Sequence, residues 1–264
     1  MTQNSEGKVS RSFKQTFTLI ELLIVISIIA ILAAMLLPAL NKARARAKAT
    51  QCISQQKEVM TAHISYADDN KGLFVLRSSY ETSYEPYHVI LSGGRWVRNQ
   101  LTFNNRTVYL PFSVFLCPAS PNVDQAMKYA EENVSNTGIK YAYGMPLDTE
   151  DSGFSERFGE ITYKFTPAGS GESRFLVSSR MRKPSALVML ADTIRPARDA
   201  SSWWFFSQSS LNLSSHPAIH TLHNNRANVA MADGHVTTMS GTELINSPMK
   251  ITGYVNAAFQ GKTE

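Results

Sequence analysis

A long apolar run near the N-terminus constrains this chain more than any other feature. From residue 17 to residue 40 about 24 residues are almost entirely apolar, which as a helix rising about 1.5 Å per residue crosses a bilayer core of roughly 30 Å. The one charged residue inside it is Glu21, and a carboxylate in hydrocarbon costs on the order of 2.5–3.5 kcal/mol. We therefore predict a membrane helix at 17–40 in which Glu21 has a partner.

The start of this run resembles a known processing signal. The segment 14–21, KQTFTLIE, followed at once by the apolar run, resembles the cleavage and methylation signal of type IV prepilins and type II secretion pseudopilins. The resemblance implies that prepilin peptidase cuts between Thr16 and Phe17 and methylates the new amine of Phe17. That family usually has Gly before the cut, and this chain has Thr16.

The resemblance also implies assembly roles for Glu21 and Pro38. After the cut, Glu21 would lie near the positive end of the helix and near an ammonium group of its own or a neighbouring subunit. Pro38 matches a proline that the family tolerates in this helix, where it removes a backbone hydrogen bond and favours a kink or local melting. An alternative remains: Thr18 and Glu21 also fit a capping box that opens an ordinary single-pass anchor.

Basic residues flank the run on both sides, so charge alone does not fix its orientation. They are Lys8, Arg11 and Lys14 before it, and Lys42, Arg44, Arg46 and Lys48 after it. The resemblance implies a single-pass protein of the inner membrane, with the leader in the cytoplasm and the C-terminal domain in the periplasm. After assembly the domain would belong to an extracellular filament. A cleaved secretory signal fits less well, because its apolar core is typically about 7–15 residues.

The chain divides into four predicted segments. Residues 1–16 form a basic leader, 17–40 the transmembrane or filament-core helix, 41–71 a soluble continuation of that helix, and 72–264 one globular domain. The helix is predicted to end at 68–72, with Gly72 as a left-handed cap. The resulting fold class is α+β and pilin-like, with one long N-terminal helix, membrane half plus soluble half, packed on an antiparallel β-rich C-terminal domain.

Periodicity predicts the packing face of the soluble half and the elements that follow. One stripe comprises Ala49, Ile53, Gln56, Met60, Ile64 and Ala67, and an adjoining face comprises Cys52, Val59 and His63. Strands are predicted at 73–77, 87–91, 107–117, 140–144, 160–165, 174–178 and 186–191. A short helix is predicted within 122–136, and loops at Gly153, Gly159 and 168–171.

Cys52 and Cys117 are the two cysteines of the chain. An exported domain lies where disulfides persist, so we predict that they pair. Closing about 64 intervening residues would contribute roughly 3–4 kcal/mol in the loop-entropy model. Two separately buried thiols are the alternative.

A second resemblance lies near the C-terminus. His223, nine further residues and Asp233-Gly234 resemble the C-terminal motif of a large group of prepilin-like proteins. The segment predicts a hairpin with a type I′ turn at Asp233-Gly234 and a return strand from His235. His223, Asp233 and His235 are metal-ligand types, and Asp192 is a further carboxylate, but residues flanking a tight turn would point away from His223.

We therefore predict that the motif holds the hairpin by hydrogen bonds, and we assign no cofactor and no metal ligand. A structural calcium or other metal ion is the alternative, although no dense run of acidic and amide residues is present. The aromatic cluster 203–206 is predicted to contribute at least in part to the core, because four adjacent side chains cannot all face one way in a strand. Surface recognition of sugars or subunits is the alternative.

No catalytic motif is present: the sequence lacks a Gly-x-Ser-x-Gly elbow, a phosphate-binding glycine loop and a Cys-x-x-Cys pair. The net charge of +5 with no basic groove excludes nucleic acid as a predicted partner. We predict a non-enzymatic structural subunit of a type II secretion pseudopilus or type IV pilus-like filament. Its partners would be the membrane, prepilin peptidase, other pilin or pseudopilin subunits and the assembly platform.

Two functions from other classes remain as alternatives. One is a membrane-anchored extracytoplasmic module that binds a ligand such as polysaccharide and does not polymerise. The other is an exported hydrolase, which would require a coherent acid/base pair in the folded domain.

Overall fold

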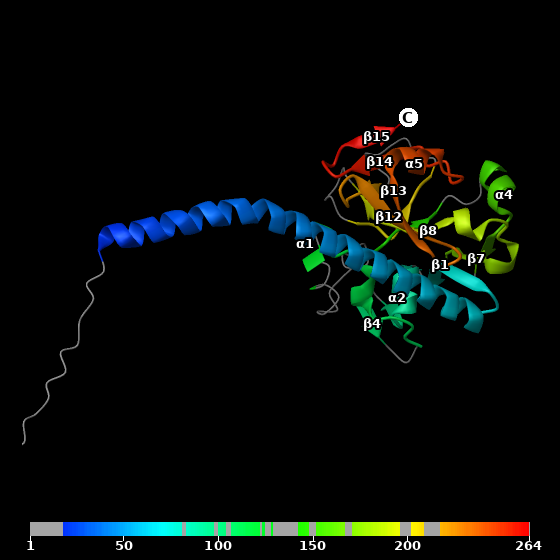
Figure 1. The fold of residues 1–264 in the computed structure, drawn as a ribbon. Coiled ribbons are helices and arrows are strands. Elements are labelled where there is room, and N and C mark those ends of the chain that lie inside the picture. The colour runs from blue at the N-terminus through cyan, green and yellow to red at the C-terminus, as the bar shows by residue number, and fades with distance from the viewer. Residues whose placement is uncertain are drawn as a thin grey trace, which may run out of the picture. The chain divides into compact units, whose positions relative to one another are not determined.

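The computed structural model describes residues 18–80, 83–97, 100–103, 107–121, 123, 124, 128, 142–147, 152–166, 171–195, 202–208 and 217–263. The chain forms two compact units, residues up to Arg44 and residues Ala45–Glu264. The architecture combines one long apolar N-terminal helix with mainly antiparallel sheets (Figure 1).

Helix α1 (Leu19–Asp69) runs for 51 residues and passes Pro38 without a break, so the local melting favoured by the sequence does not occur. The predicted C-terminal end is confirmed. Gly72 has a φ of +78°, and its N–H donates to the carbonyl of Ala67 at 2.7 Å. The left-handed cap therefore turns the chain directly into the first strand.

In the first compact unit, α1 is exposed from Leu19 onward, and apart from Glu21 it is almost entirely apolar as far as Leu40. By length and composition this part could cross a membrane, a test that a signal sequence near an N-terminus also meets. The prediction of one long apolar N-terminal helix is confirmed at that level.

In the second compact unit, α1 packs on the domain through one face. Its buried residues are Cys52, Gln56, Val59, Met60, Ala62, His63 and Ala67. The predicted stripe is wrong at Ile64, which is 36% exposed, whereas the predicted adjoining face is fully buried. Periodicity identifies two neighbouring stripes but does not decide which one faces the domain.

The shorter helices lie between the strands. They are α2 (Tyr87–Leu91), α4 (Ser152–Phe158) and α5 (Gly241–Asn246), with the 3-10 helices η1 (Phe112–Phe115), η3 (Ser178–Arg180) and η4 (Pro184–Ala186).

The strands form five sheets among the described residues. One has the order β2 (Ser83–Pro86), β1 (Leu73–Tyr80), β7 (Ser173–Val177) and β6 (Thr162–Phe165). A second has β13 (Val236–Ser240), β12 (Arg226–Met231) and β8 (Val188–Ala191). A third has β15 (Gly261–Thr263), β14 (Gly253–Asn256), β11 (Ala218–Thr221) and β9 (Thr193–Ile194). The two-stranded sheets are β3 (Gly94–Val97) with β4 (Gln100–Phe103), and β10 (Phe205–Phe206) with β5 (Met145–Pro146).

Most pairs are antiparallel, as predicted, although β11 with β14 and β10 with β5 are parallel. Strands β1, β6, β7 and β8 confirm four of the predicted runs. Strand β12 lies centrally between β13 and β8, and nearly all of its residues are buried. This sheet shares one core with the buried face of α1 and positions the candidate site.

The strand predicted at 87–91 is wrong, because these residues form α2. Its Ser92 N–H donates to the carbonyl of His88 at 3.1 Å, and Gly93 with a φ of +73° ends the turn. Four of the five helical residues are buried, so the run shows no polar side. A short apolar run without a polar face does not distinguish a strand from a buried helix.

Three other predicted elements differ from the structure. Within 107–117, Pro111 precedes η1 and the rest forms no strand, because proline supplies no ladder donor. Of 140–144, residues 140 and 141 lie outside the described residues, Gly144 forms an isolated bridge with Ala191, and β5 begins one residue later. Gly153 lies inside α4, not in a loop. Of the helix within 122–136, residues 123, 124 and 128 are helical and the others lie outside the described residues.

The C-terminal hairpin is confirmed, with β12 and β13 paired from Arg226↔Ser240 to Ala230↔Val236. Its predicted type I′ turn is wrong. Of Asp233 and Gly234, only Gly234 has a positive φ, +91°, and the N–H of Met231 donates to the carbonyl of His235 at 2.8 Å. The turn is therefore a three-residue loop that ends on a left-handed glycine.

Candidate functional site

Four ligand-type side chains converge inside the domain. Cys52 comes from α1, Cys117 follows η1, Asp192 lies between β8 and β9, and His223 follows β11. All four are buried, and their ligand atoms lie within 4.8 Å of one another. We call these four residues the buried thiol cluster.

The contacts within the buried thiol cluster are of similar length. The Cys52 thiol donates to Oδ1 of Asp192 at 3.3 Å. Nε2 of His223 lies 3.3 Å from Oδ2 of Asp192 and 3.4 Å from Sγ of Cys117. The His223 and Asp192 side chains are 3% and 2% exposed. The cluster is therefore shielded from bulk water.

A tight turn places His223. Asn224 and Asn225 have φ values of +57° and +60°, and the flanking residues His223 and Arg226 exchange both backbone hydrogen bonds, at 2.9 and 3.1 Å. This two-residue loop is of type I′, in which Asn tolerates the left-handed conformation better than most residues do. The type I′ turn predicted for the end of the motif thus lies at its beginning.

Backbone pairing places Asp192. The N–H of Asn228, on β12, donates to Oδ2 of Asp192 at 3.2 Å, and the carbonyl of Asp192 accepts from the N–H of His220 at 2.8 Å. Strand β12 therefore holds the carboxylate of Asp192, and β11 holds its backbone directly after β8.

Side chains of α1 close the cluster from the other direction. The amide of Gln56 donates to the carbonyl of Asn228 at 3.0 Å and lies 3.7 Å from Sγ of Cys52. The amide of Asn228 in turn donates to the carbonyl of Ala49 at 3.2 Å. Cys52 is thus fixed to β12 by reciprocal bonds between α1 and Asn228.

The electrostatics of the cluster favour charge separation. Burial lowers the pKa of His223, but its interactions with Asp192 and Cys52 outweigh burial and raise this pKa to about 10. Burial raises the pKa of Cys52, yet its interactions with Cys117 and His223 bring the pKa below the ordinary thiol value. Burial and the contact with Cys52 raise the pKa of Cys117 well above that value.

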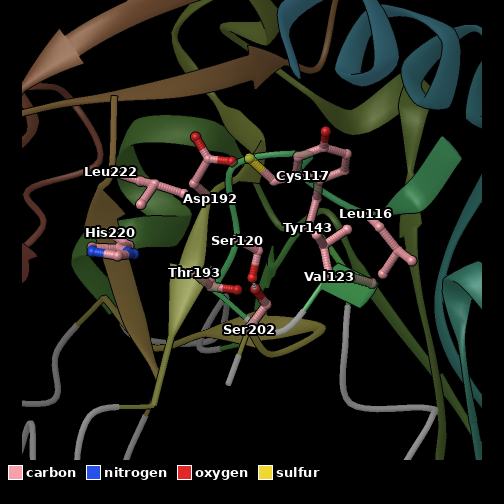
Figure 2. A pocket seen from close by; sticks show the side chains of 11 residues that line it. Leu116, Cys117, Ser120, Val123, Tyr143, Asp192, Thr193, Ser202, His220 and Leu222 are labelled. Carbon is pink, nitrogen blue, oxygen red and sulfur yellow. Dashed lines mark hydrogen bonds between the residues drawn. The ribbon is translucent and has the colours of Figure 1, made fainter. Parts of the chain in front are cut away.

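A small cavity adjoins the cluster, shown in Figure 2, where the Cys117 and Asp192 side chains point toward one another. Its volume is about 10 Å³, room for about one water molecule. Ser120 and Ser202 meet across it, with their hydroxyl oxygens 2.8 Å apart. As bounded by the described residues, the cavity leaves no room for an organic substrate beside Cys117.

The arrangement differs from a nucleophile–base–acid relay. In a relay, one imidazole nitrogen contacts the nucleophile and the other contacts the carboxylate. Here both Cys117 and Asp192 approach the same nitrogen, Nε2 of His223. Donor atoms that converge on one point, two of them sulfur, are a set that can hold a soft or borderline metal ion.

The structure separates the histidines of the C-terminal motif. Asp233 and His235 are exposed at the hairpin turn, where Oδ1 of Asp233 accepts from the N–H of His235 at 3.1 Å and lies 2.6 Å from its Nδ1. They do not join His223. Asp233 accepts a hydrogen bond from a backbone N–H, but within the turn itself, so its predicted role of holding the hairpin to the domain stays a prediction. His223 lies in the buried thiol cluster.

Cys52 and Cys117 come together, as the predicted disulfide requires, but in this structure both are free thiols. The alternative of two buried thiols agrees with this free state, although the two lie together in one cluster. Sequence reasoning considered Asp192 and His223 together as ligand types but did not join them to the cysteines. One signal could have found this site: the sequence placed Cys52 on the face that adjoins the predicted packing stripe of the helix.

The N-terminal site residues are described only in part. Thr16 and Phe17 lie outside the described residues. Oε2 of Glu21 accepts from the N–H of Thr18 at 2.9 Å and from its hydroxyl at 2.7 Å, and the N–H of Glu21 donates to Oγ1 of Thr18 at 3.3 Å. The capping box considered for this segment is therefore present.

The aromatic cluster 203–206 is divided between core and surface. Phe206 is fully buried in β10, while Trp203, Trp204 and Phe205 are partly buried. The guanidinium of Arg195 lies 4.2 Å from the ring centroid of Trp203. The prediction that at least some of these residues belong to the core is confirmed.

Comparison of the chain with protein-family models, curated proteins and solved structures found no match.

Proposed function

We propose that this chain is a structural subunit of a type II secretion pseudopilus or type IV pilus-like filament, assembled through its N-terminal helix. Prepilin peptidase would cut after Thr16, and α1 would first sit in the inner membrane with the domain in the periplasm. The pilus assembly platform would then move the helix laterally from lipid into a bundle of other pilin or pseudopilin subunits. The chain would act mechanically, without catalysis of its own.

The observation that carries the proposal is the difference between the N-terminal and C-terminal parts of α1. Its N-terminal part exposes large apolar side chains, with Leu19 88%, Ile29 58% and Leu36 67% exposed. Its C-terminal part presents one buried face to a stable domain. A helix that is apolar on all sides requires lipid or other helices around it. A helix that carries such a segment and also packs on a folded domain is what a helix-cored filament requires.

In this proposal Glu21 has two roles, a helix cap in the membrane-inserted subunit and a partner for a neighbouring subunit in the filament. In the single chain its carboxylate is satisfied by Thr18 of the same helix. Those bonds remain possible after a cut at residue 16, so the carboxylate is tolerated in the membrane-inserted subunit. In the filament the carboxylate would exchange Thr18 for the amine of a neighbouring Phe17, because an ammonium–carboxylate pair is stronger than a neutral contact in a low-dielectric core.

Three substitutions separate capping from assembly. Glu21→Gln keeps an acceptor oxygen for Thr18 but removes the charge, Thr18→Ala removes the cap and keeps the charge, and Glu21→Ala removes both. We expect all three proteins in the membrane fraction, with Glu21→Gln and Glu21→Ala lost from sheared filaments and Thr18→Ala retained. Ser27→Ala is the matched control, because the Ser27 hydroxyl donates to the carbonyl of Leu23 within its own helix.

Mass spectrometry of the native N-terminus accompanies this assay. An N-methylated chain that begins at Phe17 is the expected species. If Glu21→Gln assembles normally while Thr18→Ala and Glu21→Ala fail together, Glu21 is a cap and not an assembly residue. A chain that keeps residues 1–16 and stays dispersed in the membrane would instead identify the anchored, non-polymerising binding module.

A further inference from the structure

The spacing of the buried thiol cluster matches the edges of a metal-centred tetrahedron. With Zn–N and Zn–O bonds near 2.1 Å, the ligand nitrogen and oxygen lie about 3.4 Å apart, and with Zn–S near 2.3 Å, sulfur lies about 3.6 Å from either. Nε2 of His223 lies 3.3 Å from Oδ2 of Asp192 and 3.4 Å from Sγ of Cys117, and these two separations match such edges. Sγ of Cys52 lies 3.3 Å from Oδ1, the other oxygen of the same carboxylate, so this contact is not an edge of that tetrahedron. All four donor atoms lie within 4.8 Å of one another.

A direct ion pair explains these distances less well. A buried imidazolium–carboxylate hydrogen bond is typically about 2.7–2.9 Å, shorter than the 3.3 Å between Nε2 of His223 and Oδ2 of Asp192. Nε2 carries at most one hydrogen, yet it faces both Asp192 and Cys117. One ion placed among the donors would satisfy both contacts at once.

The donor set indicates which ion. Two thiolates and one imidazole disfavour Mg²⁺ and Ca²⁺, which take oxygen ligands, and suit Zn²⁺ in a tetrahedral site. We propose that Cys52, Cys117, Asp192 and His223 bind one Zn²⁺ ion per chain. On binding, the thiol protons and any proton on Nε2 of His223 pass to solvent, and no electron is transferred.

Four protein ligands close the tetrahedron, so the proposed ion is structural. Its ligands come from α1, the segment after η1, the β8–β9 junction and the segment before β12, which no pair of neighbouring elements could supply. The ion would therefore connect the C-terminal part of α1 to the sheet that carries the C-terminal motif. This explains why His223 belongs to the cluster although Asp233 and His235 remain at the surface.

The test uses the full chain, extracted in detergent under argon and stripped of metal with a chelator. Titration with Co²⁺ as a spectroscopic substitute should saturate at one ion per chain and produce thiolate-to-cobalt charge-transfer absorption with tetrahedral d–d bands. Zn²⁺ should displace Co²⁺ and abolish both signals. Cys52→Ser, Cys117→Ser, Asp192→Asn and His223→Gln should each lose the stoichiometric tetrahedral signal, and His235→Gln should keep it as the exposed histidine control.

Counting thiols distinguishes the proposal from a disulfide, because the chain contains only two cysteines. In the natively isolated protein, zinc-bound thiols should resist alkylation and both should react once a chelator and denaturant are added. Two thiols that react fully on denaturation, with no metal present beforehand or taken up on titration, would overturn the proposal. Thiols that appear only after a reductant would overturn it in favour of the disulfide.

A substitution outside the four ligands keeps the proposal testable if a ligand variant does not fold. Gln56→Met removes the amide near Sγ of Cys52 and fills the same space. Such outer-shell changes typically weaken metal affinity by about 10–100-fold without abolishing it. Affinity unchanged from the wild-type chain, in a folded Gln56→Met protein, would contradict a metal held by Cys52.

Discussion

The two halves of α1 are one secondary structure in two different surroundings. The part before Arg44 is apolar on all sides and exposed, whereas the part after it presents a single buried face to the domain. Helical continuity therefore follows from local backbone preference, and side-chain pattern decides what each half requires around it. An all-round apolar surface needs lipid or other helices, whereas a one-sided face needs only the sheet beside it.

The largest expected effect is on the stability of the domain, and it is tested by the same change, Met to Ala, in each half of α1. Met60 is fully buried, so Met60→Ala should lower the free energy of unfolding of the domain by about 2–5 kcal/mol through lost contacts and a residual cavity. Met35 is 71% exposed, and Met35→Ala should change that free energy by less than about 0.5 kcal/mol. Denaturant unfolding of the full chain, followed by domain fluorescence, measures both. Equal losses would remove the distinction between the halves.

The opposite asymmetry is expected for membrane insertion. Ile29→Asp places a carboxylate near the centre of the apolar run and should disfavour insertion by about 2.5–3.5 kcal/mol. Ile64→Asp, on the half-exposed edge of the domain face, should leave the partition of the chain unchanged. Carbonate extraction of membranes reports the distribution of each variant. Ile64→Asp protein released from the membrane like Ile29→Asp protein would show that both halves contribute to anchoring.

A third expected effect concerns the pH dependence of stability and belongs to the buried half of α1. His63 is fully buried near the rings of Phe74 and Tyr87, and burial lowers its pKa to about 3. The unfolded chain binds this proton more readily, so stability should fall as the pH drops from about 6.5 toward 3, by up to about 1.4 kcal/mol per pH unit.

His63→Phe keeps a ring in this position and should flatten that acid limb in a pH series of thermal unfolding. His235→Phe is the control, because His235 is exposed at the hairpin turn. His220, whose pKa burial lowers to about 4, should maintain part of the slope in both variants. An acid limb that is unchanged in His63→Phe would show that the protonation of other groups governs acid unfolding.

Local patterns predicted the elements whose defining residues are close together in the chain. The helix end at Gly72, the strands β1, β6, β7 and β8, and the hairpin of β12 and β13 follow from caps, alternation and turn residues. The strand prediction for 87–91 failed because a short buried segment has no polar side, so its periodicity cannot be determined. The turn of the hairpin failed because a three-residue loop and a type I′ turn both use Gly234.

Local sequence patterns could not predict the candidate site. Sequence reasoning grouped His223 with Asp233 and His235, which are near it in the chain, and paired Cys52 with Cys117 as a disulfide. In the folded domain the residues near in sequence separate, and Asp192 and His223 meet both cysteines, with Asp192 140 residues from Cys52. The hydrogen bonds of Asn228 to α1 and to Asp192 hold these residues together.

The sequence by itself determined the long helix, its change from an all-round apolar segment to a one-sided face, and the C-terminal hairpin, because each is encoded by residues within a few turns of one another. Only the tertiary structure decided that Cys52, Cys117, Asp192 and His223 form one buried cluster. Their convergence depends on the register of β12 against β8 and on the docking of α1, and these long-range pairings leave no periodic trace in the chain.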